Sequence, residues 1–124
     1  MTLPVTNNIF ERGLLRYLSA EQLKKIQSVK VGIGGAGGRG SNVAMILTRS
    51  GFTRLEIIDF EIIDESNLTR QQYFVNDIGL LKSDVLTKRL KEINPDVAVI
   101  GHKAMWAPEI GDLDRKSTRL NSSH

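Results

Sequence analysis

The fold of this chain is decided by residues 29–40, which read VKVGIGGAGGRG. The first five of these positions alternate apolar with other residues, which is the period of a β-strand. The strand runs into a turn with the spacing Gly35-x-Gly37-x-x-Gly40, and helical spacing resumes over Ser41–Ser50. Glycines in such a turn let the backbone approach an anion at the helix N-terminus. The stretch therefore predicts a phosphate-binding strand–turn–helix unit; a turn that serves only close helix–strand packing is the alternative.

Helical and strand periods alternate along the rest of the chain. Ser19 and Gln22 have the spacing of a capping box, Gly51 is a C-cap candidate, and Asn94-Pro95 ends a helix. This order of elements predicts an α/β fold with a parallel, Rossmann-like sheet. The predicted helices span 9–17, 20–27, 41–50 and 83–93, the strands span 29–33, 55–59 and 97–100, and a polar loop with a short helical turn covers 60–77.

The composition indicates one folded domain. With 40% hydrophobic and 25% charged residues, the chain is too apolar for a disordered protein. The chain contains no cysteine, which excludes disulfide bonds and thiolate metal sites. No apolar run approaches the ~20 residues that span a bilayer, and the N-terminus lacks a signal-peptide pattern. We therefore expect a cytoplasmic protein that has no membrane partner.

The end of the chain differs in character from the rest. Asp114–His124 reads DRKSTRLNSSH, which resembles the translation of a widely used sequencing adapter over its whole length. We interpret this segment as read-through that is not native; a genuine Ser-rich tail is the alternative. It carries three basic residues and one acidic residue, so most of the net charge of +3 comes from it. The positive charge therefore indicates no nucleic-acid surface, and we expect the native chain to continue past Leu113.

An acidic residue ends the second predicted strand. Asp59 follows Gly35 by 24 residues, close to the ~20-residue spacing at which an acid accepts hydrogen bonds from ribose hydroxyls. An acid that only caps a strand end is the structural alternative. Together with the glycine turn, Asp59 predicts an adenine-nucleotide site, and these residues alone do not separate NAD from ATP.

The segment after Asp59 separates the two nucleotides. Ser66–Gln71 reads SNLTRQ, and Gly79-x-x-Lys82 follows it. A dehydrogenase has no use for an Asn, an Arg and a Lys beyond the ribose, whereas nucleotidyl transfer needs fixed cations that stabilise charge on phosphate oxygens. The spacing therefore favours a transfer reaction on ATP. For Arg70 and Lys82, a surface salt bridge is the alternative.

These motifs, in this order, resemble the ThiF/MoeB/ubiquitin-activating enzyme family. The family pattern comprises a glycine turn, a strand-end Asp, SNLxRQ, GxxK and a closing Asn-Pro, and it covers residues 31–97 here. Within the family, Arg16-Tyr17, Arg49–Phe52 and Gln71–Phe74 look most like the short bacterial ThiF members of thiamine biosynthesis. Arg39 departs from the pattern, which has a leucine there; it is either a read error or crowds the contact between helix and sheet.

The resemblance implies a role for each motif residue. The glycine turn would bind the ATP phosphates and Asp59 the ribose, while Arg70 and Lys82 would be the catalytic cations that polarise the triphosphate. An N-terminal arginine, Arg12 or Arg16, would enter the site of the partner subunit in a homodimer. The implied nucleotide-binding residues are Gly35, Gly37, Gly38, Gly40, Asp59, Asn67, Arg70, Gln71 and Lys82.

The resemblance also implies the reaction. It is the ATP-dependent adenylation of the C-terminal carboxylate of a ubiquitin-like sulfur carrier protein, which yields an acyl-adenylate and pyrophosphate. No side-chain nucleophile is needed for this step, because positioning and charge neutralisation suffice. Mg²⁺ would accompany ATP, with its aspartate ligand expected beyond Leu113; the sequence assigns no metal ligand in this chain and does not decide whether zinc is bound.

Three alternatives to this function stay open. The first is an enzyme of the same family similar to tRNA threonylcarbamoyladenosine dehydratases, for which the partner would be a nucleic acid. The second is an NAD-dependent oxidoreductase, and the third is a nucleotide-binding fragment without activity.

The expected organisation has three parts. Residues 1–28 form a helical segment, residues 29–113 the N-terminal part of a ThiF-type nucleotide-binding domain, and residues 114–124 the read-through. Residues 1–113 supply about three strands, so an apolar face and an unpaired edge of the parallel sheet would be left open to water. We therefore expect the 124-residue product to be inactive and to associate, and removal of residues 114–124 to restore neither property.

Overall fold

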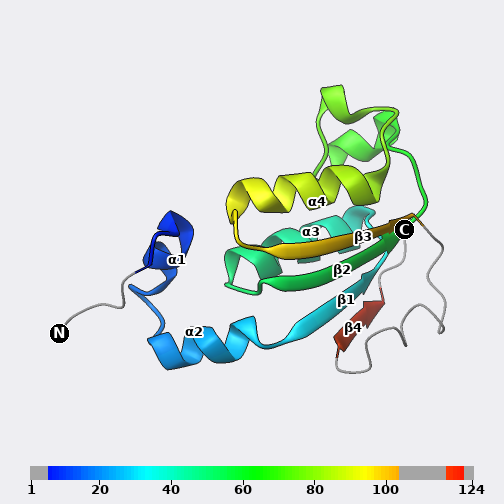
Figure 1. Cartoon of the computed structure of the whole chain (residues 1–124). Coiled ribbons are helices and arrows are strands. Elements are labelled where there is room, and N and C mark those ends of the chain that lie inside the picture. The colour runs from blue at the N-terminus through cyan, green and yellow to red at the C-terminus, as the bar shows by residue number, and fades with distance from the viewer. Residues whose placement is uncertain (1–5, 104–116, 122–124) are drawn as a thin grey trace.

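A parallel β-sheet forms the centre of the computed structural model, which describes residues 6–103 and, as backbone, residues 117–121. Its strands lie in the order β3-β2-β1-β4, and every neighbouring pair is parallel (Figure 1). This sheet confirms the predicted fold class. The strands are β1 (Lys30–Gly34), β2 (Arg54–Asp59), β3 (Ala98–Lys103) and β4 (Ser117–Asn121).

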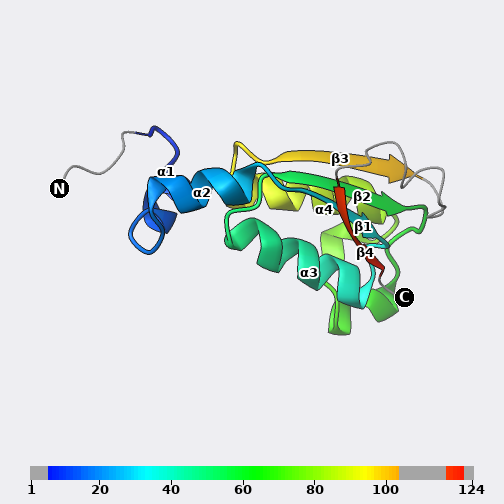
Figure 2. The same ribbon diagram turned by 90° about the horizontal axis from the view of Figure 1, so that it is seen from below.

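The helices α3 and α4 cover one face of this sheet (Figure 2). Alternate residues of β1 and β2 point toward them, and Ile33, Ile57, Leu86 and Leu90 are fully buried in the resulting core. No helix of the described part is long and apolar enough to cross a membrane. The helical elements are α1 (Ile9–Leu14), α2 (Ala20–Gln27), α3 (Gly38–Arg49), α4 (Lys82–Ile93) and the 3₁₀ turns η1 (Glu65–Thr69) and η2 (Val75–Asp77).

Local signals predicted the helix ends well where side chains cap them. The bounds of α2 are those predicted, and both bonds of its capping box are present: Gln22 N–H donates to Ser19 Oγ at 3.0 Å, and Ser19 N–H donates to Gln22 Oε1 at 2.9 Å. Gly51 follows the C-cap of α3 with a φ of +106°, a conformation that favours glycine.

Two helix boundaries differ from the predicted ones by three residues, and two others by one. Helix α1 ends at Leu14 instead of Tyr17, and the chain leaves it in a turn in which Arg16 N–H bonds to Gly13 O at 3.3 Å. Helix α3 begins at Gly38 instead of Ser41, because the last part of the glycine run takes up helical geometry. The glycine run therefore supplies both the turn and the first helical residues.

The fourth strand was not predicted. It falls in the segment interpreted as read-through, and Ser117 lies opposite Lys30 of β1. Strand β4 thus covers the edge of the sheet beside β1, while β3 lies at the other edge, with no further strand beside it in the described part of the chain. An unpaired edge offers backbone N–H and C=O groups to any extended chain that reaches it, so this pairing does not require a native sequence. The interpretation as read-through stays a prediction, as do the three domain boundaries.

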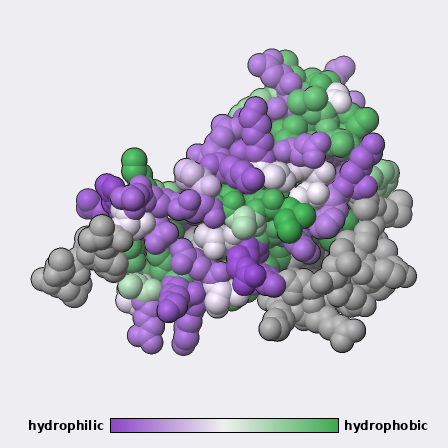
Figure 3. Space-filling view, in the orientation of Figure 1, coloured by the Kyte–Doolittle hydropathy of each residue, from purple (hydrophilic) through white to green (hydrophobic). Residues whose placement is uncertain are grey.

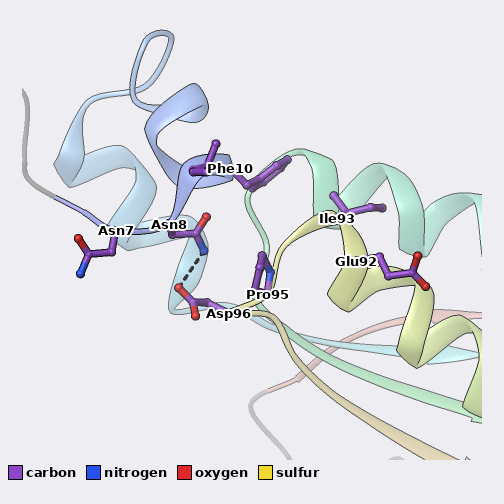
Figure 4. Close-up of a pocket in the computed structure, with 8 residues that line it drawn as sticks. Asn7, Asn8, Phe10, Glu92, Ile93, Pro95 and Asp96 are labelled. Carbon is purple, nitrogen blue, oxygen red and sulfur yellow. Dashed lines mark hydrogen bonds between the residues drawn. The ribbon is translucent and has the colours of Figure 1, made fainter.

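Asn94, in the Asn94-Pro95 motif, anchors the N-terminal segment to the sheet domain. Asn8 Nδ2 donates to Asn94 Oδ1 at 2.7 Å. It also donates to Asp96 Oδ2 at 2.8 Å, the bond drawn in Figure 4. Asn8 is also the N-cap of α1, where its Oδ1 accepts a hydrogen bond from Glu11 N–H at 2.9 Å. A cavity of about 550 Å³ lies at this junction, and no predicted site residue lines it; its walls are Asn7, Asn8, Ile9, Phe10, Glu92, Ile93, Pro95 and Asp96.

Candidate functional site

The turn between β1 and α3 has the shape of an anion cradle. Gly35 has a φ of +104°, which favours glycine, and its N–H donates to Ile58 O at 2.8 Å. Gly37 is the N-cap of the twelve-residue helix α3 and makes no side-chain cap bond. The first N–H groups of a helix have no partner within the helix and carry a partial positive charge. This arrangement is the one predicted for binding phosphate.

The expectation that Arg39 crowds the helix–sheet contact is wrong. Arg39 is exposed, on the outer side of the first turn of α3, whereas Gly40 is buried. Because consecutive helical residues point about 100° apart, an arginine at this position reaches solvent without disturbing the packing of Gly40.

Asp59 holds the glycine turn from beneath. It is 1% exposed, and both carboxylate oxygens accept backbone hydrogen bonds: Oδ2 from Ala36 N–H and Oδ1 from Glu61 N–H, each at 2.6 Å. The end of β2 is thereby tied to the centre of the glycine turn. This geometry gives Asp59 a loop-holding role, and its contact with a ribose stays a prediction.

Arg70 lies over the first residue of α3. A Cβ added at Gly38 would stand 3.7 Å from Arg70 Nε and 3.9 Å from its Cγ and Cδ. The guanidinium-bearing side chain therefore runs past the start of α3, at ordinary van der Waals distance from the place of a Gly38 Cβ. Since Arg70 is exposed, its charge is accessible to a ligand in the cradle. Arg70 thus lies beside the glycine turn, and its role toward the triphosphate stays a prediction.

Lys82 is a buried cation rather than part of a surface salt bridge. It is 3% exposed, and its Nζ lies 3.6 Å from Glu61 Oε1. The backbone N–H of Lys82 donates to the carbonyl oxygen of Glu61 at 3.0 Å. The residues just before Lys82 pair antiparallel with residues 61–63, through Ile62 and Leu81. Gly79 begins this segment with a φ of +91°, which explains the glycine of the GxxK motif. The sequence analysis did not assign Glu61 to the site, although its place two residues after the strand-end Asp59 was a signal.

Asn67 and Gln71 lie next to each other and are both 8% exposed. Asn67 Oδ1 accepts a hydrogen bond from Asp64 N–H at 2.8 Å and so caps η1. Gln71 N–H donates to Asn67 O at 3.0 Å, while Gln71 Oε1 is buried without a hydrogen-bond partner among the described residues. Leaving a buried acceptor unsatisfied costs about 1–3 kcal/mol, so this oxygen is suited to a donor on a ligand.

Tyr73 belongs to the same site and was not predicted to do so. Its hydroxyl donates to Ala36 O at 2.5 Å, and the residue is 3% exposed. Burial, together with the negative charges of Asp59, Asp77 and Glu61, raises the pKa of Tyr73 well above its usual value. The hydroxyl therefore stays a donor throughout the physiological pH range.

The N-terminal arginines lie away from this site. Arg12 belongs to α1, and its Nε donates to Thr6 O at 2.8 Å. Helix α1 lies at the opposite end of the strands from the glycine turn (Figure 1). A role for Arg12 or Arg16 in a partner subunit stays a prediction. Among residues 6–103, no three His, Cys, Asp or Glu side chains form a cluster that could hold a metal ion.

Comparisons of the sequence point to one family. The profile of the ThiF family matches residues 10–120. The chain is 41% identical over 83 residues to the probable molybdopterin-synthase adenylyltransferase of Porphyra purpurea, covering 66% of this chain and 22% of that protein. It is 34% identical over 97 residues to ubiquitin-like modifier-activating enzyme 5 of Arabidopsis thaliana, covering 77% and 22%. It is 32% identical over 93 residues to the tRNA threonylcarbamoyladenosine dehydratase of Bacillus subtilis (strain 168), covering 74% and 37%.

Solved structures with a similar fold include proteins bound to ATP. E. coli MccB with ATP superposes with a TM-score of 0.78 at 28% identity, covering 98% of this chain and 39% of that chain. The E. coli tRNA N6-threonylcarbamoyladenosine dehydratase TcdA in complex with ATP shares the fold, with a TM-score of 0.82 at 24% identity over 90% of this chain and 48% of that chain. This chain spans less than half the length of each of these proteins. With its glycine turn, Arg70 and Lys82 arranged on this fold, the chain belongs to the ThiF family.

Proposed function

We propose that the full-length protein carrying this sequence adenylates a carboxylate with ATP. The observation that carries the proposal is the position of Arg70, whose side chain crosses the glycine start of α3 within 4 Å of the place of a Gly38 Cβ. An exposed arginine over a helix N-terminus suits a polyphosphate. The guanidinium group and the helix N–H groups both donate hydrogen bonds to phosphate oxygens, and both carry positive charge that balances the phosphate charge. The names of relatives as adenylyltransferases support this assignment.

The arrangement suits the transfer step. A carboxylate oxygen of the substrate attacks the α-phosphorus, the bond from that phosphorus to the bridging oxygen breaks, and pyrophosphate leaves with the electron pair. Negative charge grows on the phosphate oxygens, and fixed cations stabilise it. We assign this stabilisation to Arg70 and Lys82 and the binding of the phosphates to the N–H groups of the glycine turn. Mg²⁺ is proposed only as the usual companion of ATP.

We further propose a ubiquitin-like sulfur carrier as the carboxylate substrate, which rests on the relatives named for such chemistry. The dehydratase relative from Bacillus subtilis, which is 32% identical over 74% of this chain, makes a modified tRNA the second candidate. We propose thiamine biosynthesis as the pathway, because three segments resemble short bacterial ThiF members: Arg16-Tyr17, Arg49–Phe52 and Gln71–Phe74.

The loop between β2 and α4 supports the proposed homodimer. Apolar side chains gather on its outer surface (Figure 3), where Val75 is 72%, Ile62 and Phe74 are each 58%, and Leu80 is 51% exposed. Exposed apolar patches of this kind mark protein–protein contacts. The loop also carries Arg70, so a second subunit bound there would lie close to the site.

The full-length protein is expected to bind ATP more tightly than NAD. NAD lacks the γ-phosphate that two cations would neutralise, and one charge-assisted contact contributes about 1.5–3 kcal/mol, or roughly 10- to 100-fold in affinity. Calorimetric titration with each nucleotide measures the difference. Tighter binding of NAD would contradict the proposed function and favour an oxidoreductase.

Substrate-dependent exchange separates the two candidate substrates. With a sulfur carrier ending in a free carboxylate, the protein is expected to exchange radiolabelled pyrophosphate into ATP, because adenylation is reversible. The same carrier with an amidated C-terminus is the control and supports no exchange. Exchange that requires threonylcarbamoyl-modified tRNA, and ignores the carrier, would identify the dehydratase-like function.

A further inference from the structure

The peptide groups on either side of Ala36 are held by two different side chains. Ala36 N–H donates to Asp59 Oδ2 at 2.6 Å, and Ala36 C=O accepts the hydroxyl of Tyr73 at 2.5 Å. Ala36 is 0% and Tyr73 3% exposed, so water does not compete for these bonds. A residue fixed at both polar groups does not rotate, and the N–H groups of the glycines that follow it keep one orientation.

Asn42 makes a second connection to the loop that carries Arg70. Its Nδ2 donates to Gly38 O and to Arg70 O, the latter at 3.2 Å, and its Oδ1 accepts a hydrogen bond from Gln72 Nε2 at 2.5 Å. Gln72 N–H also donates to Ser41 Oγ at 3.4 Å. One side chain on α3 thus joins the start of that helix to the backbone of the cationic loop.

We infer that Tyr73 and Asn42 are positioning residues that lock the Arg70 segment onto the glycine turn. Asn42 holds the Arg70 carbonyl, and Tyr73 holds the same segment three residues later. The side chain of Arg70 is thereby set over Gly38 before any ligand arrives. Donors and charges that are oriented in advance stabilise phosphate more than mobile ones do. The inference rests on the proposed ATP site and deepens it.

Removal of the Tyr73 hydroxyl is expected to weaken phosphate binding selectively. In the full-length protein, Tyr73→Phe is expected to bind ATP about 10-fold more weakly, the effect of one lost buried hydrogen bond. Adenosine binding is expected to change less than about twofold, because adenosine has no phosphate for the turn to hold. The KM for ATP in pyrophosphate exchange should rise by a similar factor, while the KM for the carboxylate substrate stays constant.

Two further variants complete the test. Tyr17→Phe makes the same chemical change at a residue that is 87% exposed, and is expected to leave the affinities for ATP and adenosine unchanged. Asn42→Ala, at a half-buried position on α3, is expected to show the Tyr73→Phe pattern with a smaller loss of about threefold in ATP affinity. It provides the same comparison if Tyr73→Phe does not fold.

The outcomes are distinct. The inference is wrong if Tyr73→Phe and Asn42→Ala bind ATP as tightly as the wild type, or if adenosine binding falls as much as ATP binding. A failure of the proposed function appears in the wild type itself, as ATP binding without any pyrophosphate exchange, and the comparison of ATP with adenosine still decides the role of Tyr73. A wild type that binds no ATP would overturn both.

Discussion

Lys82→Ala and Arg70→Ala are each expected to slow ATP–pyrophosphate exchange by about 10²–10³-fold in the full-length protein, the cost of removing one preorganised charge contact from a developing phosphate anion. Lys82 is buried beside Glu61, so its ammonium group cannot be replaced by a solvent cation. Arg70 reaches the cradle from an exposed position, so its loss should also raise the Kd for ATP. Initial exchange rates at saturating ATP measure the slowing of the reaction, and calorimetric titration with ATP measures the change in Kd.

Matched controls lie on the same helices as the site. Lys88→Ala on α4 and Arg49→Ala on α3 each remove an exposed positive charge outside the glycine turn and are expected to keep wild-type rates. Wild-type exchange by either Lys82→Ala or Arg70→Ala would show that the residue has no part in the transfer. Equal losses in the control variants would show that net charge, rather than position, controls the rate.

Asp59→Ala is expected to lower the free energy of unfolding by about 2–6 kcal/mol. The substitution leaves the N–H groups of Ala36 and Glu61 without their acceptors, and each buried unsatisfied donor costs about 1–3 kcal/mol. Asp59→Asn keeps one acceptor oxygen and should therefore lose about half as much. ATP affinity is expected to fall in both variants, because the glycine turn loses its anchor on β2.

Urea denaturation of the full-length protein measures this difference. Glu21→Ala is the control, since it removes an exposed carboxylate from the first turn of α2 and is expected to change the unfolding free energy by less than about 0.5 kcal/mol. An Asp59→Ala variant as stable as this control would show that Asp59 does not hold the turn. Its ribose contact would then be the only role left to test.

Much of the fold was predictable because its signals are local. The alternation of positions 29–33, the capping box of Ser19 and Gln22, and the helix stop at Asn94-Pro95 each concern residues a few positions apart. Such signals act through backbone conformation and nearby hydrogen bonds, so the order of elements and the parallel sheet followed from them. The glycine turn was predicted for the same reason, although the start of α3 within it was not.

The sequence by itself determined which residues are proposed to carry the chemistry: the glycines of the turn, Asp59, Arg70 and Lys82. Only the tertiary structure decided which groups they contact, because the contacts join residues that are 21 to 37 positions apart: Lys82 with Glu61, Asp59 with Ala36, Arg70 with Gly38, and Tyr73 with Ala36. Parallel pairing of β1 with β2 brings the ends of both strands to one edge of the sheet, and the loop between β2 and α4 folds back over that edge. No local pattern records such a meeting, since it depends on which strands pair and in which register.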